Sequence, residues 1–399
     1  MTSDPIVIVS AARTPIGGFM GDFASLAAPQ LGAVAIRAAV ERAGVDPQQV
    51  REVLFGCVLQ AGVGQAPARQ ASLGAGLPLS AGCTTIHKVC GSAMKATMLA
   101  HDLLLAGSND IIVAGGMESM SSAPYLLPKA RAGYRLGHGA LIDHMFFDGL
   151  EDAYEKDEKG GRRLMGTFAE DCARSYGFSR AEQDHFALTS LERARSANSD
   201  GSFAWEIAPV TVAGRKGERV VDKDEQPFAA NLDKIPTLKP AFRKDGTVTA
   251  ANSSSISDGA AALVLMRRSS AEKLGVTPLA TVLGHATHAQ QPALFTTAPV
   301  GSMQRLFACL GWQARDVDLF EINEAFAVVT MAAMKELDLP HDKVNVHGGA
   351  CALGHPIGCS GARIIVTLIG ALRKYGFRRG VASLCIGGGE ATAIGLELA

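Results

Sequence analysis

The sequence predicts an α/β protein built from two related halves, with a further region inserted between them. At the start of the chain an apolar strand pattern, an amphipathic helix pattern and a second strand pattern follow one another, which is the order of a βαβ unit. A helix pattern that leads into an apolar strand, a run of glycines and an acidic residue occurs twice. With 399 residues, 47% of them hydrophobic, the chain is long enough for more than one domain.

The first half contains five predicted elements. Apolar residues at 6–10 predict a buried strand, the spacing over 31–44 predicts an amphipathic helix, and 53–58 predict a second strand. Helical spacing returns over 91–107, which ends at a glycine, and residues 111–118 then predict another buried strand. A helix therefore leads into a buried strand at the end of this half.

The second half repeats the last part of the first. Residues 361–375 have helical spacing, Gly376 ends the predicted helix, and 381–390 predict a strand followed by a glycine turn. The segments IIVAGGMES and SLCIGGGEA both place glycines and then an acidic residue directly after an apolar strand. This similarity indicates two related α/β halves.

The region between the halves differs in composition. Residues 122–255 are richer in charge, and the run at 155–163 alternates in sign, which is typical of a solvated loop. We therefore expect an N-terminal half at 1–121 that is completed by about 256–275, an inserted loop or cap domain at 122–255, and a C-terminal half at 276–399.

The bulk properties exclude several classes of protein. A net charge of -1 provides no basic patch for nucleic acid or for an anionic membrane, and no apolar run is long enough to span a bilayer. The start of the chain has no secretory-signal pattern. Eight cysteines without a CxxC pair fit a reducing cytosol better than a disulfide scaffold. We expect a cytoplasmic protein that binds neither nucleic acid nor membranes and holds no metal.

Cys90 is the first candidate for chemistry. It lies in HKVCGSAMKA, at the first turn of the predicted 91–107 helix, where unpaired N–H groups and the helix dipole favour a thiolate. Gly91 and Ser92 leave room for a ligand beside the sulfur. The alternative is a small core residue at a strand–helix junction. This segment alone leaves both interpretations open.

Three further candidate residues lie where a predicted strand or helix meets a loop. His355 lies in a loop of small residues before a helix, and a turn-capping histidine is the alternative. Cys385 precedes a glycine run whose backbone N–H groups can form an oxyanion hole, whereas an inert strand cysteine is the alternative. Asn323 follows an apolar strand pattern and is either a polar site residue or a helix cap.

Together these segments resemble the thiolase family, from VIVSAARTPIG at 7–17 to the end of the chain. Five motifs occur in the order of the family: VCGSAMKA around Cys90, AGGMESMS from Ala114, NEAFA from Asn323, GGACALGHPIGCSGAR from Gly348 and CIGGGEA from Cys385. The resemblance implies a duplicated thiolase fold, in which two mixed five-stranded sheets and their helices form layers around an inserted loop domain. It also implies homodimers or homotetramers.

The resemblance assigns roles to the candidates. It makes Cys90 the acylated nucleophile, His355 the group that activates it, and Cys385 the acid/base that handles the α-proton of the second substrate. It gives His355 and a water held by Asn323 to the enolate oxygen, and the N–H groups of Cys90 and Gly387 to the acyl carbonyl. Gly387 is then expected to matter for its amide and its lack of a side chain.

The expected activity is the reversible condensation of two acetyl-CoA molecules through an acetyl-cysteine, within fatty acid metabolism. The substrates are CoA thioesters, and no other cofactor is expected. A broad-range degradative 3-ketoacyl-CoA thiolase is the nearest alternative. A decarboxylating ketoacyl synthase would use two histidines, whereas this sequence has Cys385 at the second position. A non-catalytic acyl-CoA or lipid carrier would lack one or more of Cys90, His355 and Cys385, whereas this chain has all three.

Departures from the family pattern concern the substrate pocket. Short-chain relatives usually have His-Met-Gly where this chain has Leu164-Met-Gly, whereas Ser254 keeps a pantetheine-contacting position. Phe228 replaces a common arginine, which puts the usual contact near the CoA adenine in doubt. The expected wall of the acyl pocket is formed by Leu150, Met165 and Phe326.

Overall fold

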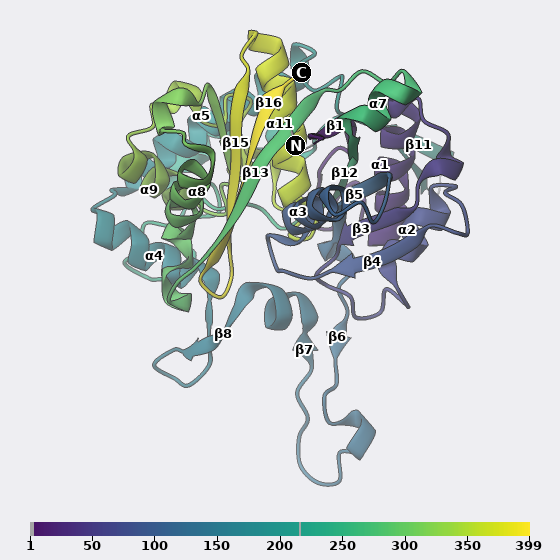
Figure 1. Cartoon of the computed structure of the whole chain (residues 1–399). Helices are drawn as coiled ribbons and strands as arrows, with labels where there is room; N and C mark the ends of the chain where they lie inside the picture. The colour runs from purple at the N-terminus through teal and green to yellow at the C-terminus, as the bar shows by residue number, and fades with distance from the viewer. Residues whose placement is uncertain (1–3, 215–216) are drawn as a thin grey trace.

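A single ten-stranded sheet organises the molecule, with strands in the order β14-β15-β16-β13-β1-β12-β5-β3-β4 and β2 paired to β12. The structure, a computed structural model, describes residues 4–214 and 217–399 (Figure 1). The expectation that the start of the chain has no secretory signal falls partly on residues 1–3, which lie outside the described residues. None of the described helices combines the length and the hydropathy needed to cross a membrane.

The N-terminal half supplies one side of the sheet. Its strands are β1 (Ile6–Arg13), β2 (Gly17–Gly18), β3 (Glu52–Gly56), β4 (Gly82–Ile86), β5 (Ile111–Ser119) and β12 (Ser257–Arg267), and its helices are α1 (Ala28–Ala43), α2 (Pro67–Gly74), α3 (Ser92–Leu105) and α7 (Arg268–Leu274). β12 comes from much later in the chain than its neighbours, and it pairs antiparallel with both β1 and β5.

The C-terminal half supplies the other side. Its strands are β13 (Ala280–Ala289), β14 (Leu319–Ile322), β15 (Arg379–Ile386) and β16 (Glu390–Leu398), and its helices are α8 (Ala298–Leu310), α9 (Ala327–Leu337), α10 (Ala350–Leu353) and α11 (Ser360–Tyr375). The two halves join where β1 meets β13, through the pairs Val7–Thr281 and Ile8–Ala280.

The expected fold class is present, but the arrangement of strands differs in two ways from two separate five-stranded sheets. The sheets are continuous, and the C-terminal half has four strands where the N-terminal half has five besides β2. At the outer edge Val344 forms only an isolated parallel bridge with Phe320. The next residue, Asn345, has a φ of 49° and bonds Ile322 through its side chain, so the chain leaves the sheet after one bridge.

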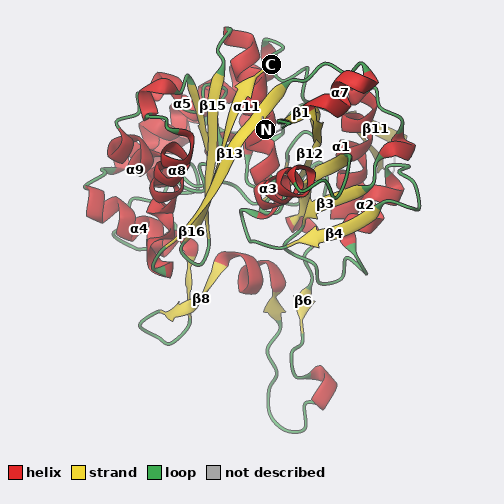
Figure 2. Ribbon diagram, viewed as in Figure 1, coloured by secondary structure: helices red, strands yellow, loops and turns green. Residues whose placement is uncertain are grey.

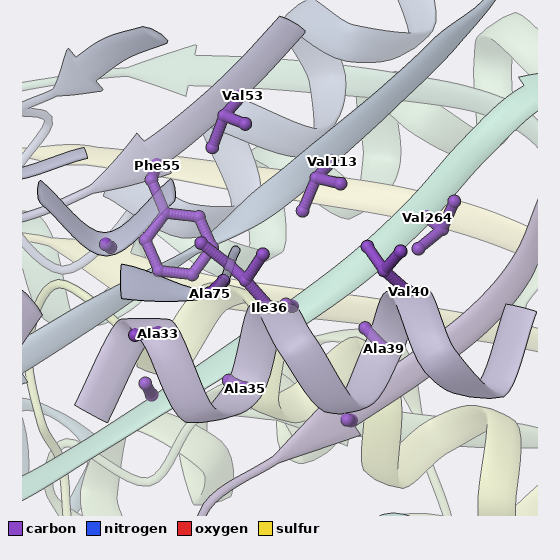
Figure 3. Close-up of a cluster of buried hydrophobic side chains, with 14 of the residues drawn as sticks. Ala33, Ala35, Ile36, Ala39, Val40, Val53, Phe55, Ala75, Val113 and Val264 are labelled. Atoms are coloured by element: carbon purple, nitrogen blue, oxygen red, sulfur yellow. The ribbon is translucent and has the colours of Figure 1, made fainter. Parts of the chain in front are cut away.

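Helices cover the two faces of the sheet and fill the space between its halves (Figure 2). α1 packs on the outer face of the N-terminal strands, and Ile36 and Val40 lie against Val53, Val113 and Val264 (Figure 3). α3 and α11, the two helices of the sequence repeat, share one core with the inner faces of both sets of strands. α8 and α9 pack outside the C-terminal strands. The repeated helices therefore lie at the centre of the molecule.

Between β5 and β12 the chain forms smaller elements: β6 (Tyr125–Leu126), β7 (Ile142–Asp143), β8 (Glu151–Lys156), β9 (Arg162–Leu164), α4 (Met165–Tyr176), α5 (Arg180–Ser199), β10 (Val210–Gly214), β11 (Gly217–Val221) and α6 (Gln226–Ala229). A capping box between Ser179 and Glu182 begins α5. The chain between β6 and β7 forms an arm that projects from the body, and the charged run at 155–163 occupies the exposed turn between β8 and β9 (Figure 1).

Candidate active site

Cys90 lies in the short loop between β4 and α3. The loop is tight, because Val89 has a φ of 45° and the Ser92 hydroxyl accepts a hydrogen bond from the Lys88 N–H and donates one to the Val89 carbonyl. α3 begins at Ser92 with Gly91 as its N-cap, so Cys90 precedes the helix and is not in its first turn as expected.

The resting sulfur is a thiol, contrary to the expectation of a favoured thiolate. Burial raises the pKa of Cys90 to about 11, although the N–H groups of Gly387 and of Cys90 itself oppose that rise. Desolvation therefore outweighs the stabilisation that these two N–H groups give to the thiolate. A base must take the Cys90 proton before the sulfur can act as a nucleophile at neutral pH.

His355 can be that base. It lies between α10 and α11, and burial, followed by the nearby Arg363 charge, lowers the pKa of His355 to about 3, so its imidazole is neutral. Its Nδ1 lies 2.5 Å from Ser360 Oγ, whose hydroxyl donates to the Pro356 carbonyl at 3.0 Å. Since Ser360 has already donated its proton, Nδ1 carries the hydrogen and Nε2 keeps its lone pair.

Within the described part of the chain Nε2 of His355 is buried and has no hydrogen-bond partner. A free lone pair on a buried nitrogen is the acceptor that a thiol proton needs. The surroundings of His355 thus set both its charge and its tautomer for proton abstraction.

Asn323 lies beside the imidazole and directly after β14. The amide is fully buried, and its Nδ2 lies 3.5 Å from His355 Nδ1. Because Nδ1 carries a hydrogen and Nδ2 is also a donor, the two nitrogens make no hydrogen bond. Its Oδ1 has no partner among the residues that the structure describes. α9 begins only at Ala327, after Phe326 as N-cap, so the helix-cap alternative for Asn323 is wrong. An unpartnered buried carbonyl is suited to hold a water or a polar ligand group.

Cys385 ends β15 on the other side of the same space. Its side chain is fully buried, and burial, followed by the proximity of Cys90, raises its pKa well above the usual value. Both thiols line the same cavity, and negative charge on Cys90 disfavours ionisation of Cys385.

Gly387 follows Cys385 in the tight turn between β15 and β16. Its N–H stabilises the Cys90 thiolate, as expected for an oxyanion-hole donor. The left-handed φ values belong to Gly388, at 93°, and Gly389, at 86°. A Cβ at Gly387 would meet the nearest atoms, of Met165 and Val89, at 3.7 Å, so the fold itself does not require a glycine there.

The three reactive side chains meet in one cavity of about 350 Å³. Cys90, His355 and Cys385 line it, together with the expected pocket residues Leu150, Met165, Ser254 and Phe326, whereas Asn323 and Gly387 do not reach its surface. Sequence reasoning missed the apolar walls formed by Phe146, Ile256, Phe295 and Ile357. Ile357 stands within the GGACALGHPIGCSGAR motif, but sequence alone does not tell which side of a loop faces the cavity.

Two residues concern the expected binding of CoA: Ser254, an expected contact, and Phe228, which replaces the arginine of an expected contact. Ser254 donates both its N–H and its hydroxyl to the Ala325 carbonyl, at 3.0 and 2.9 Å, which leaves the oxygen of its hydroxyl free to accept. Phe228 on α6 is 49% exposed and carries no charge for a phosphate. The site therefore combines a nucleophilic thiol, a neutral imidazole base and a second thiol above a mostly apolar pocket, an arrangement suited to acyl transfer.

Comparisons with known proteins agree with this chemistry. The thiolase N-terminal domain matches residues 6–269 and the thiolase C-terminal domain matches residues 276–398. "Acetyl-CoA acetyltransferase 2" of Arabidopsis thaliana is 51% identical over 98% of this chain and 97% of that protein. "Acetyl-CoA acetyltransferase" of Cupriavidus necator is 48% identical over 98% of this chain and 99% of that protein. The crystal structure of the Bacillus anthracis acetyl-CoA acetyltransferase has a TM-score of 0.96 at 41% identity, over 100% and 99% of the two chains.

The chain belongs to the thiolase family, and it is an acyltransferase with the thiolase fold. The family membership expected from five short motifs is thereby confirmed over the whole described chain. The roles of individual side chains rest on the geometry described above.

Proposed function

We propose that this thiolase is an acetyl-CoA C-acetyltransferase, which converts two acetyl-CoA molecules reversibly to acetoacetyl-CoA and CoA. The observation that carries the proposal is the meeting of Cys90, His355 and Cys385 on one small apolar cavity. Two relatives that share 51% and 48% of their residues with this chain bear the name of that activity. CoA thioesters are the substrates, and the chemistry needs no other cofactor.

The first half-reaction transfers the acetyl group to the protein. His355 Nε2 takes the proton of Cys90, and the thiolate attacks the thioester carbonyl of acetyl-CoA. The N–H groups of Cys90 and Gly387 stabilise the oxyanion that forms. As the carbonyl re-forms, the bond to CoA breaks and the CoA sulfur receives a proton from the Cys385 thiol, which becomes a thiolate while His355 keeps the proton of Cys90. One thioester replaces another, so the step has little thermodynamic cost.

The second half-reaction makes the carbon–carbon bond. Cys385 removes an α-proton from a second acetyl-CoA, while His355 and a water on Asn323 Oδ1 stabilise the enolate oxygen. The carbanion attacks the acetyl carbonyl on Cys90, acetoacetyl-CoA leaves, and the Cys90 thiolate takes its proton back from His355, so both cysteines end the cycle as thiols. The high pKa of Cys385 suits it to this step, because a strong base is needed for a weakly acidic carbon.

The cavity wall sets the length of the acyl chain. Leu150, Met165 and Phe326 close it with bulky groups, which favours a two-carbon acyl group on Cys90. Leu164 makes the wall apolar, and each further buried methylene would contribute about 0.8 kcal/mol if space exists. That apolar wall supports a second candidate function, a broad-range degradative 3-ketoacyl-CoA thiolase.

Thiolysis rates separate these functions. We expect kcat/KM to fall steeply from four-carbon to six- and eight-carbon 3-oxoacyl-CoA substrates. A flat or rising series would identify the broad-range enzyme instead. Binding of acyl-CoA without any exchange of label between acetyl-CoA and CoA would identify a non-catalytic carrier and contradict both proposals.

The projecting arm supports an oligomer. Large apolar side chains gather on it with little cover: Leu136 is 98% exposed, and Leu141 and Leu127 are 64% and 52% exposed. Contiguous exposed apolar groups mark interaction surfaces. We therefore expect a cytoplasmic homodimer or homotetramer, and the mass of the particle in solution tests the assembly.

A further inference from the structure

The repeated acidic residue of each half has no part in the chemistry described so far. Glu118 stands in the segment IIVAGGMES and Glu390 in SLCIGGGEA, at matching places after the glycines. The local structures differ, because β5 continues through Glu118, whereas a turn follows β15 and Glu390 begins β16. Because Glu118 and Glu390 match in the repeat although the backbone around them differs, we expect a similar role of their two side chains.

Glu118 is fully buried and binds only groups outside its own strand. Its carboxylate accepts the N–H groups of Val58 at 3.0 Å, Leu59 at 3.1 Å and Gly358 at 2.9 Å. Gly358 belongs to the loop that carries His355. A carboxylate with several backbone N–H donors is a strong fixed anchor. Glu118 of the N-terminal half thus holds the His355 loop of the C-terminal half.

The surrounding glycines show how closely this loop sits on β5. A Cβ at Gly116 would overlap the carbonyl oxygen of Gly358. A Cβ at Gly358 would lie 2.6 Å from both Glu118 Oε2 and the Met117 carbonyl oxygen. Close approach of the two backbones therefore needs glycine on both sides. The carboxylate and the loop fit together as one packed unit.

Glu390 makes the reciprocal contact. Its carboxylate forms an ion pair with Lys88, two residues before Cys90, and the two side chains are 35% and 21% exposed. The same turn packs against the Cys90 loop, because a Cβ at Gly91 would overlap the Ile386 side chain. Glu390 of the C-terminal half thus holds the Cys90 loop of the N-terminal half beside the Gly387 N–H.

We propose that these two acids are positioning residues that anchor, across the interface between the halves, the catalytic loop of the opposite half: Glu118 places His355, and Glu390 with Lys88 places Cys90. The inference rests on the proposed function for the roles of His355 and Cys90. Charge adds a second effect, since the Glu118 carboxylate raises the pKa of Cys90. Each half therefore controls the geometry of the other's reactive group.

The first test uses Glu118→Gln. A glutamine has one acceptor oxygen and brings an NH₂ group toward three N–H donors, so the His355 loop should shift. We expect kcat for acetyl exchange to fall about 100-fold with KM little changed, since misplacement by about 1 Å costs that much. Glu272→Gln, an exposed acid on α7, is the matched control and should retain the wild-type rate.

Alkylation of Cys90 by iodoacetamide separates positioning from simple loss of fold. Removing the Glu118 charge should move the midpoint of the alkylation profile to lower pH, while acetyl exchange falls. A wild-type exchange rate in Glu118→Gln, or lost exchange with an unmoved midpoint, would overturn the assignment of Glu118. Because alkylation needs no acetyl-CoA, a moved midpoint in a protein that never acetylates would refute the proposed function and leave the anchor standing.

The second test uses the partly exposed pair, whose variants should fold. Glu390→Gln and Lys88→Met should each lower the acetylation rate of Cys90 about fivefold, as fits the loss of one ion pair at this exposure. The charge-exchanged double variant K88E/E390K should recover most of that loss. Unchanged acetylation rates in both single variants would overturn the role of Glu390. So would a double variant whose loss of rate equals the product of the two single losses.

Discussion

Ser360 offers a selective perturbation of the base. Its hydroxyl accepts the Nδ1 hydrogen of His355 at 2.5 Å and donates to the Pro356 carbonyl at 3.0 Å, so the serine fixes the imidazole tautomer. Ser360→Ala removes both bonds without adding volume. In the variant the other tautomer, with hydrogen on Nε2, is no longer disfavoured. That tautomer cannot accept the proton of Cys90.

The size of the effect follows from the burial of the group. Leaving a buried N–H without an acceptor costs about 1–3 kcal/mol. If that free energy moves the imidazole out of its productive tautomer, the acetylation rate should fall about 5- to 150-fold, at 1.36 kcal/mol for each factor of ten. KM for acetyl-CoA should change little, since Ser360 does not line the cavity.

Single-turnover acetylation of Cys90, followed by release of CoA, measures the effect. Ser302→Ala is the matched control, because Ser302 is equally buried and donates to a proline carbonyl at 3.0 Å but contacts Ser383 instead of the imidazole. Both variants should lose comparable stability to urea. Equal acetylation rates in Ser360→Ala and Ser302→Ala would refute the assignment of the tautomer to Ser360.

Three further outcomes follow from the structure. Cys385→Ala should still acetylate on Cys90 and lose condensation and thiolysis, so near-normal turnover in this variant would remove Cys385 from the mechanism. Leu164→His should add a polar group to the apolar wall and lower kcat/KM for eight-carbon more than for four-carbon substrates, and an equal effect on both would show that Leu164 does not touch the acyl chain. Burial, followed by the Lys374 charge, lowers the pKa of His347 to about 4, so between pH 6.5 and 4 the unfolded chain binds the extra proton and stability falls on acidification. Between pH 6.5 and 5, the free energy of unfolding measured with urea should fall by about 2 kcal/mol less in His347→Phe than in the wild type. Equal decreases would show that protonation of His347 does not cause the loss of stability.

The sequence predicts the site well because its residues lie in short motifs next to regular elements. Cys90, His355 and Cys385 each stand within a few residues of a helix or strand whose periodicity is clear. The repeat also locates α3 and α11, which form the central layer. What sequence periodicity cannot supply is the register between distant segments, such as the pairing of β12 with β5 and, across more than half of the chain, with β1.

The charge state of Cys90 shows a second limit. The helix dipole acts over one turn and is visible in the sequence, whereas desolvation depends on side chains from several distant segments. Leu150, Met165 and Phe326 were predictable because the family motifs place them. Phe146 and Phe295 are not, since Phe146 comes from the inserted region and Phe295 from the segment between β13 and α8, and the two meet at one cavity only in the folded chain. Glu118 was visible as a repeated acid, but its partner Gly358 was not.

Acyl transfer to one specific sulfur is the central claim, and the mass of the peptide that carries Cys90 tests it most directly. After incubation with acetyl-CoA, the wild-type protein should carry one acetyl group on that peptide and Cys90→Ala should carry none. An acetyl group on Cys385 with Cys90 unmodified would reverse the roles of nucleophile and base. No acetyl group on either thiol would contradict the account.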